Sequence, residues 1–272
     1  MSGIYFHIPF CKQACHYCNF HFSTSLKHKS AVLQAMKKEL RHFAERGWQG
    51  PINTLYFGGG TPSILSVSEI EAFITQAAQL FNLDPAAEIT LEANPDDLTA
   101  DKMQELAGSS VNRLSVGIQS FNAGELRWMN RAHTPTEALE SLEATARLFP
   151  NYSLDLIYGI PGSNMELWAD NLKQALQFNP PHISAYALTV EPRTALSSFI
   201  AKGRSPDVDE GQTQEQFEHL VQTLTGVGYD HYEISNFAKP GFYSRNNSAY
   251  WQGETYLGIG PAAHSFDGEK RW

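Results

Sequence analysis

Cys11-Lys12-Gln13-Ala14-Cys15-His16-Tyr17-Cys18 contains every cysteine of this chain, three in 272 residues. An odd number of cysteines so close together is not a disulfide framework, and pairing over this short range is geometrically unfavourable. The C-x3-C-x2-C spacing directly follows a strand-like segment at residues 4–8. Metal ligation therefore explains this loop better than disulfide bonding.

Three thiolates on one short loop suit an iron–sulfur cluster, because they can bind three corners of a cubane and leave one iron open. An open iron can chelate the amino and carboxylate groups of S-adenosylmethionine (SAM) and pass an electron to its sulfonium. The sequence thus predicts a [4Fe–4S] cluster on Cys11, Cys15 and Cys18 that works with SAM. The alternative is a Cys3His zinc site that uses His21 or His16.

A glycine run, Gly58-Gly59-Gly60-Thr61-Pro62, follows the next predicted strand. Glycines let the backbone approach a ligand closely, and their exposed carbonyl oxygens can accept hydrogen bonds from an ammonium group. An isolated glycine run is more often a tight turn, here before a helix capped by Ser66. Its place after the next strand would bring it and the cysteine loop to one site.

Short β-branched or aromatic runs alternate along the chain with amphipathic stretches, a pattern typical of βα units around a parallel sheet. We predict strands at residues 4–8, 54–57, 88–92, 113–117, 153–157 and 182–185. Helices are expected at residues 30–46, 68–81, 99–107, 136–148 and 165–178, several of them beginning at Ser or Thr. The fold class is therefore α/β, an incomplete (β/α)6 barrel of mostly parallel strands.

The pattern changes after Leu188, where a loop rich in Pro, Arg and Gly precedes a predicted helix at 210–224 and a strand at 232–234. Residues 1–188 would form the barrel core, and residues 189–272 its remainder and the start of a C-terminal extension. Because the chain stops at Lys270-Arg271-Trp272 without a polar tail, we expect it to be truncated.

The composition narrows the functional classes. With 42% hydrophobic residues the chain can bury a large core, and a net charge of -9 with scattered basic residues disfavours nucleic-acid binding. No apolar run is long enough to cross a bilayer and no cationic signal region precedes the first strand, so we expect a cytoplasmic protein; peripheral contact with a membrane partner stays open.

Longer motifs carry a resemblance to a known family: Tyr5-Phe6-His7-Ile8-Pro9-Phe10-Cys11, Leu91-Glu92-Ala93-Asn94-Pro95, Asn112 to Phe121, Asp155 to Gly162 and Tyr232 to Ala238. With the cysteine and glycine motifs, they resemble the oxygen-independent coproporphyrinogen III oxidase group of radical SAM proteins, and more closely its HemW haem-chaperone branch. The resemblance implies a radical SAM partial barrel whose C-terminal domain is missing from this chain.

The same resemblance implies SAM contacts wherever the motifs match. Aromatic packing beside the cluster and SAM is implied for Tyr5 and Tyr17. The methionine end of SAM would be lined by Gly59, Gly60 and Thr61. Polar contacts are implied for Glu92, Gln119, Arg131 and Asp155, with Ala187 and His264 closing the site. These residue types fit, because a sulfonium favours carboxylates and a methionine carboxylate favours an arginine.

The branch is indicated by Phe20, since the dehydrogenase branch has a fourth cysteine two residues after the third. The resemblance thus implies a haem chaperone that binds haem and delivers it to haem-requiring proteins, with no catalytic residue assigned. The alternatives are a coproporphyrinogen III dehydrogenase and an iron–sulfur redox or scaffold protein that does not use SAM. Asn246 stands where the chaperone branch has a histidine implicated in haem handling, so no haem ligand is assigned.

Overall fold

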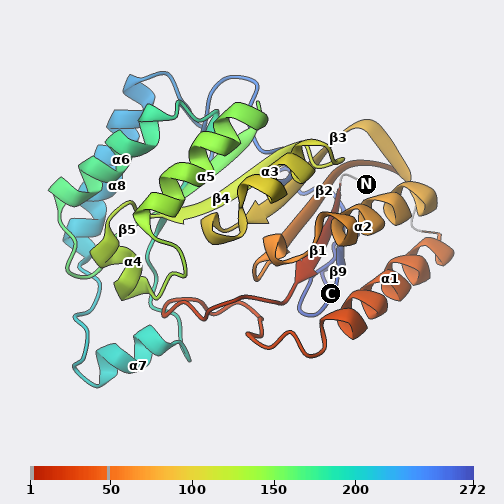
Figure 1. Cartoon of the computed structure of the whole chain (residues 1–272), viewed down its shortest axis with the longest axis horizontal. Coiled ribbons are helices and arrows are strands. Elements are labelled where there is room, and N and C mark those ends of the chain that lie inside the picture. The colour runs from red at the N-terminus through yellow and green to blue at the C-terminus, as the bar shows by residue number, and fades with distance from the viewer. Residues whose placement is uncertain (1–2, 48–49) are drawn as a thin grey trace.

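The computed structural model describes residues 3–47 and 50–272, and in these residues one nine-stranded sheet has the order β7-β8-β6-β5-β4-β3-β2-β1-β9 (Figure 1). Its first six strands are β1 (Gly3–Ile8), β2 (Pro51–Gly59), β3 (Asn82–Ala93), β4 (Arg113–Gln119), β5 (Tyr152–Tyr158) and β6 (His182–Ala187). The five neighbouring pairs among these six strands are all parallel. The six predicted strands are therefore confirmed.

The last three strands extend the sheet at both edges. β9 (Tyr256–Ile259) pairs parallel with β1, whereas β8 (Asn236–Ala238) pairs antiparallel with β6 and with β7 (Asp230–His231). In the described part of the chain β7 and β9 are the two ends of the strand order, so the barrel stays open. Residues on both sides of position 188 build this one sheet, and the proposed domain boundary there stays a prediction.

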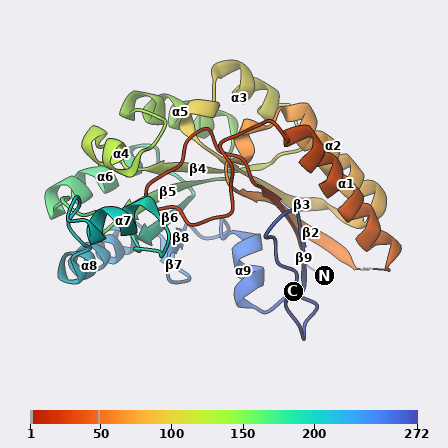
Figure 2. The same ribbon diagram turned by 90° about the horizontal axis from the view of Figure 1, so that it is seen from below.

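The longer helices cover the convex side of the curved sheet, whereas α9 (Arg245–Trp251) lies on the concave side (Figure 2). The crossover helices are α1 (Lys29–Glu45), α2 (Val67–Leu80), α3 (Ala100–Ala107), α5 (Pro135–Leu148), α6 (Met165–Gln177) and α8 (Glu210–Gly226). Shorter ones are α4 (Ala123–Met129), α7 (Ala195–Ala201) and α9 (Arg245–Trp251). Among the described residues no helix is long and apolar enough to span a membrane.

The helix starts follow from local sequence. Ser66 and Glu69 form a capping box at α2, and Thr134 and Glu137 form another at α5, so each side chain satisfies a backbone N–H of the first turn. α1 ends before Gly47, whose φ of +77° suits a residue without a Cβ. The expected helices are thus present within a residue or two of their predicted limits.

Alternation along the strands separates the apolar core from the site. Phe6, Leu55, Leu91, Leu114 and Ile183 are fully buried in the core between the sheet and the helices. Their neighbours along the strands point to the concave side, because successive side chains of a strand alternate. Those neighbours are mostly polar: Tyr56, Glu92, Ser115, Asp155 and Ser184.

The strand predicted at residues 232–234 is wrong. This segment is a bend between β7 and β8, in which Ser235 N donates to Glu233 Oε1 at 3.1 Å. The Tyr232 hydroxyl lies 2.7 Å from His182 Nε2 on β6, and Ile234 is 68% exposed. The contact between Tyr232 and His182 therefore takes the place of the backbone hydrogen bonds that the predicted strand would have made.

Candidate functional site

The cysteine loop leaves the carboxyl end of β1 and is fixed at its base. Cys11 N donates to Ser23 O at 3.1 Å, and Ser23 N donates to Pro9 O at 2.9 Å. All three cysteines are free thiols and partly exposed. The loop is therefore held at both ends while its thiols remain accessible.

The turn after α4 holds the middle of this loop. Asn130 Nδ2 donates to Ala14 O at 2.7 Å, and Gln13 Nε2 donates to Asn130 Oδ1 at 2.7 Å. His16 N donates to Met129 O at 3.0 Å, and His16 Nδ1 lies 2.7 Å from Trp128 O. The backbone of the cysteine loop is thus clamped from outside by one turn.

The glycine run packs directly against the strand that leads to Cys11. Gly60 N donates to Ile8 O at 2.9 Å, and a Cβ at Gly60 would lie 2.7 Å from Phe10 O. Gly59 has a φ of +105°, and a Cβ there would lie 2.7 Å from the His7 ring. Glycine is required here because the chain's own backbone and side chains approach so closely.

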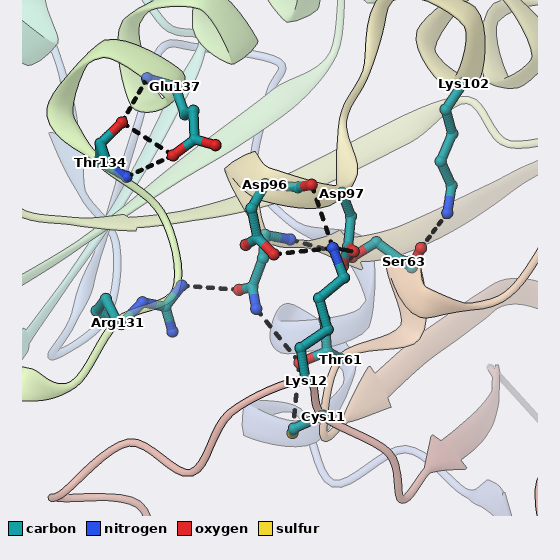
Figure 3. Close-up of polar contacts among 11 residues, drawn as sticks. Cys11, Lys12, Thr61, Ser63, Asp96, Asp97, Lys102, Arg131, Thr134 and Glu137 are labelled. Atoms are coloured by element: carbon teal, nitrogen blue, oxygen red, sulfur yellow. Dashed lines mark hydrogen bonds and ion pairs between the residues drawn. The ribbon is translucent and has the colours of Figure 1, made fainter. Parts of the chain in front are cut away.

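Thr61 connects the two loops (Figure 3). Its Oγ1 donates to Cys11 Sγ at 3.3 Å and accepts a hydrogen bond from Asn94 Nδ2 at 3.3 Å. Arg131 Nη2 donates to Asn94 Oδ1 at 2.7 Å, and Arg131 Nη1 lies 3.7 Å from Cys15 Sγ. Burial raises the pKa of Cys11 to about 11, and the hydrogen bond from Thr61 acts in the opposite direction.

Lys12, the residue after Cys11, holds the cysteine loop through ion pairs. Lys12 forms ion pairs with Asp96, at 2.9 Å, and with Asp97 (Figure 3). Asp97 is buried and accepts a hydrogen bond from Ser63 at 2.6 Å. Lys12 therefore ties the cysteine loop to the residues that follow β3.

A cavity of about 490 Å³ extends from this loop into the concave side of the sheet and contacts α9 at Asn247. The three cysteines stand at its mouth, and its walls are the inward side chains of β2 to β6. Gln119 at the end of β4 has a φ of +67°, a conformation that non-glycine residues rarely adopt. Such strain is concentrated at functional sites.

Carboxylates inside the cavity are half-buried and hydrogen-bonded. Tyr56 donates to Glu92 Oε1 at 2.9 Å, and Ser115 and Ser153 donate to the carboxylate of Asp155 at about 3.1 Å. Burial raises the pKa of Glu92 to about 7 and also raises that of Asp155. A bound cation would therefore stabilise charge on these groups.

Comparison with known proteins identifies the arrangement. Residues 5–175 match the model of the radical SAM superfamily. The chain is 36% identical to the haem chaperone HemW of Lactococcus lactis over 267 residues, which are 97% of this chain and 69% of that protein. HemW of Escherichia coli is also 36% identical, with 96% of this chain and 69% of that protein covered.

The chain belongs to the HemW family of radical SAM proteins. The fold of this HemW-family chain resembles that of a solved enzyme, coproporphyrinogen III oxidase (HemN) from Escherichia coli, with a TM-score of 0.85 and 27% identity. That match covers 99% of this chain and 65% of the HemN chain. The chain thus spans about two thirds of the length of these relatives.

Most of the expected contact residues of this HemW-family chain lie together. Nine of them line the cavity: Tyr17, Gly59, Gly60, Thr61, Glu92, Gln119, Arg131, Asp155 and Ala187. Tyr5 does not line it, although its ring stacks on that of Tyr56 at 5.9 Å. His264 is exposed after β9 and also lies outside the lining.

The sequence analysis did not predict the cavity residues that lie on the strands, away from the cysteine loop. The inward side chains there are polar or aromatic: Tyr56, Arg113, Ser115, His182, Ser184 and Tyr186. A usable signal was present, because polar residues recur two apart within otherwise apolar strands, as at Arg113 and Ser115 or at His182 and Ser184. The same spacing is expected for the polar face of any inward-facing strand.

The cysteine loop offers the donor atoms that the implied cluster needs. The three thiols are free, they lie on one loop at the cavity mouth, and two of them accept contacts from Thr61 and Arg131. Among the described residues no three His, Cys, Asp or Glu side chains are close enough to hold a single metal ion. The donor set fits a cubane better than zinc, because each cysteine thiolate of a cubane binds a different iron, whereas a single zinc ion needs all of its ligands around one point.

The residues that were expected to distinguish the two branches are both near the cavity. Phe20 lines its mouth and is 65% exposed. Asn246 is buried in the first turn of α9, whereas its neighbour Asn247 lines the cavity. A histidine at position 246, which the resemblance implies for the chaperone branch, would therefore take a buried position next to Asn247, which lines the cavity.

Proposed function

We propose that this chain binds a [4Fe–4S] cluster on Cys11, Cys15 and Cys18, holds SAM in the adjacent cavity, and carries haem to a haem-requiring acceptor protein. The observation that carries the proposal is the 36% identity to HemW chaperones over 96–97% of the chain. We further propose the cytoplasm as its compartment, because reducing conditions keep cluster thiolates free.

The side chains of the cavity give each part of SAM a partner of suitable chemistry. Arg131 would pair with the methionine carboxylate through Nη1, since a hydrogen bond between two charged groups is stronger than one between neutral groups. Glu92 would face the ammonium or sulfonium group, and Asp155 would accept from the ribose hydroxyls. The remaining contacts would come from Tyr17, Gly59, Gly60, Thr61, Gln119 and Ala187. For Tyr5 and His264 a contact with SAM stays a prediction.

When bound, the cluster supplies an electron to the sulfonium of SAM. The residues of the chain position the cysteine loop and surround its thiolates. The clamp from Asn130 fixes the loop backbone, Thr61 donates to Cys11 Sγ, and Arg131 lies beside Cys15 Sγ. Hydrogen bonds to cluster sulfurs tune its reduction potential.

The second candidate is a coproporphyrinogen III dehydrogenase, which the TM-score of 0.85 to HemN favours. Phe20 argues for the carrier, because the resemblance to the dehydrogenase branch implies a cysteine at this place. The test is to titrate anaerobically reconstituted protein with haem and to assay coproporphyrinogen III with SAM. The proposal predicts a saturable shift of the Soret band and no decarboxylation. SAM-dependent porphyrin formation would instead establish the dehydrogenase.

A further inference from the structure

We propose that the inner end of the cavity is a carboxylate-binding subsite in which Arg113 receives a propionate group of the bound tetrapyrrole. Arg113 is the first residue of β4, lines the cavity and is only 2% exposed. The choice of a tetrapyrrole as the source of the carboxylate rests on the proposed haem binding. The subsite itself rests on the surroundings of the guanidinium.

The guanidinium has donors without acceptors. Among the described residues neither Nε nor Nη2 of Arg113 has a hydrogen-bond partner. The nearby carboxylate is Glu88, whose Oε2 lies 3.9 Å from Arg113 Nε and is too distant for a hydrogen bond. Glu88 Oε1 accepts instead from Arg245 N at 3.0 Å. A buried charged donor without an acceptor is costly, so this side chain is suited to receive an anion.

The other polar groups at this depth satisfy one another. His182 Nδ1 lies 2.8 Å from Ser153 Oγ, and His182 Nε2 lies 2.7 Å from the Tyr232 hydroxyl. Burial and the charge of Arg113 lower the pKa of His182, so this imidazole is neutral at pH 7. Asp155 accepts from Ser153 at 3.1 Å. The network thus leaves Arg113 as the cationic donor at the inner end.

This subsite is distinct from the one offered by Arg131. Arg131 Nη2 donates to Gly117 O at 2.8 Å, and Gly117 is four residues beyond Arg113 on β4. Four residues of a strand span about 13 Å. One guanidinium therefore stands by the cysteines and the other at the start of β4, so the two subsites are separate. SAM and a tetrapyrrole would occupy the same cavity, so Arg113 serves the tetrapyrrole when SAM is not bound.

The cavity walls between Arg131 and Arg113 include aromatic and aliphatic side chains that could contact a flat ring system carrying a carboxylate group. Tyr56, Ile157 and Tyr186 line the cavity, and Tyr186 is 43% exposed. A cavity of about 490 Å³ has the size typical of small-molecule sites. Haem combines a flat apolar macrocycle with two propionates, which is the chemistry that these walls and Arg113 recognise.

The test compares haem with its dimethyl ester, which keeps the macrocycle and removes both negative charges. Dissociation constants from Soret titrations are measured for the wild type, Glu88→Gln, Arg113→Gln and the double variant Arg113→Gln/Glu88→Gln. The double variant is included because Arg113→Gln alone leaves Glu88 buried without its cation and can fail to fold. Arg245→Gln is the matched control, since its exposed guanidinium binds Ala86 O outside the cavity.

We expect the wild type and Arg245→Gln to bind haem at least roughly tenfold more tightly than the ester, as a charge-assisted hydrogen bond requires. Glu88→Gln should increase this preference, because the competing carboxylate is gone, and the double variant should abolish it. Equal binding of haem and ester by the wild type, or an undiminished preference in the double variant, would overturn the subsite while leaving haem carriage intact.

A second measurement covers failure of haem binding itself. Sodium propionate, compared with sodium chloride at equal ionic strength, should raise the melting temperature of the wild type and Glu88→Gln but not of the double variant. Suppose that haem does not bind but propionate still stabilises the wild type and Glu88→Gln and not the double variant. The proposal that Arg113 binds a tetrapyrrole is then overturned, and the ligand of the subsite is a small free carboxylate. If propionate has no such effect either, the subsite is overturned with it.

Discussion

Gln13 and Asn130 are joined at two points, because Gln13 Nε2 donates to both Asn130 Oδ1, at 2.7 Å, and Asn130 O, at 3.0 Å. The side-chain amide of Asn130 donates in turn to Ala14 O. These bonds connect residues 117 positions apart and fix the backbone between the first two cysteines. The retention of a cluster should therefore depend on a residue that touches no iron.

Asn130→Gly should keep the fold but loosen the cysteine loop. The φ of Asn130 is +58°, which glycine adopts without strain, so only the side-chain hydrogen bonds are lost. We expect a stability change within about 1 kcal/mol and faster loss of iron to a chelator. Asn179→Gly is the control, since Asn179 also has a positive φ of 49° but binds Lys239. Equal iron loss from both variants would contradict a role for the clamp.

Thr61→Val should make the reduction potential of the cluster more negative. The substitution keeps the shape of Thr61 and removes the hydrogen bond to Cys11 Sγ. A bond of about 1 kcal/mol corresponds to roughly 40 mV for one electron, measurable by anaerobic redox titration. Thr90→Val is the control, because Thr90 Oγ1 is buried without a hydrogen-bond partner among the described residues. A potential unchanged by Thr61→Val would refute this tuning.

Binding of SAM should weaken as the pH falls below about 7. Burial raises the pKa of Glu92 to about 7, so below that pH the group is neutral and a cation must displace its proton. Above pH 7 the carboxylate is already charged and this contribution levels off. Equilibrium dialysis at several pH values should show the dependence in the wild type and a flatter profile in Glu92→Gln. Parallel profiles would exclude Glu92 as the cation's partner.

The same group gives a second, ligand-free signature. Because the folded pKa of about 7 exceeds the ordinary value of 4.5, Glu92 contributes stability that is fully present below pH 4.5. That contribution, on the order of 3 kcal/mol, is lost as the pH rises through about 7. Denaturant unfolding of the apo-protein should show the wild type losing stability relative to Glu92→Gln between pH 4.5 and 7. A pH-independent difference would argue against a half-buried, neutral Glu92.

Histidine substitutions on α9 should act differently at two adjacent positions. Asn247 lines the cavity, so Asn247→His would present an imidazole to bound haem and shift its Soret band. Asn246 is only 8% exposed, and a larger ring there should cost about 1–3 kcal/mol of stability without a spectral change. Haem titration with absorbance and thermal unfolding distinguishes the two. A spectral change from Asn246→His alone would reverse this assignment.

The strand pattern of the barrel was predictable because apolar runs and helical stretches alternate regularly. The short helices α4, α7 and α9 were missed, since each has seven residues and lies in a loop after a strand. The signal at α4 was local, as Asn122 caps its first turn. The clamp that α4 provides depends on a contact between distant residues, which periodicity does not reveal.

The candidate site was predictable at its mouth and not at its floor. The cysteine and glycine motifs are contiguous in sequence, so their spacing alone indicates adjacent loops. Arg113 belongs to a strand motif that reads as core, and its position emerges only when Glu88 and His182 are brought beside it by the sheet. The place of His264 follows from the edge strand β9, which pairs with β1 across almost the whole sequence.

In the proposed function, the three thiolates hold a cluster with one iron open to SAM. The most direct test is EPR of the anaerobically reconstituted and reduced protein, recorded with and without saturating SAM. The account predicts a [4Fe–4S] signal whose shape changes on addition of SAM, and loss of that signal in Cys15→Ser. A cluster signal that SAM leaves unchanged, or a protein that takes up zinc and no iron, would contradict it.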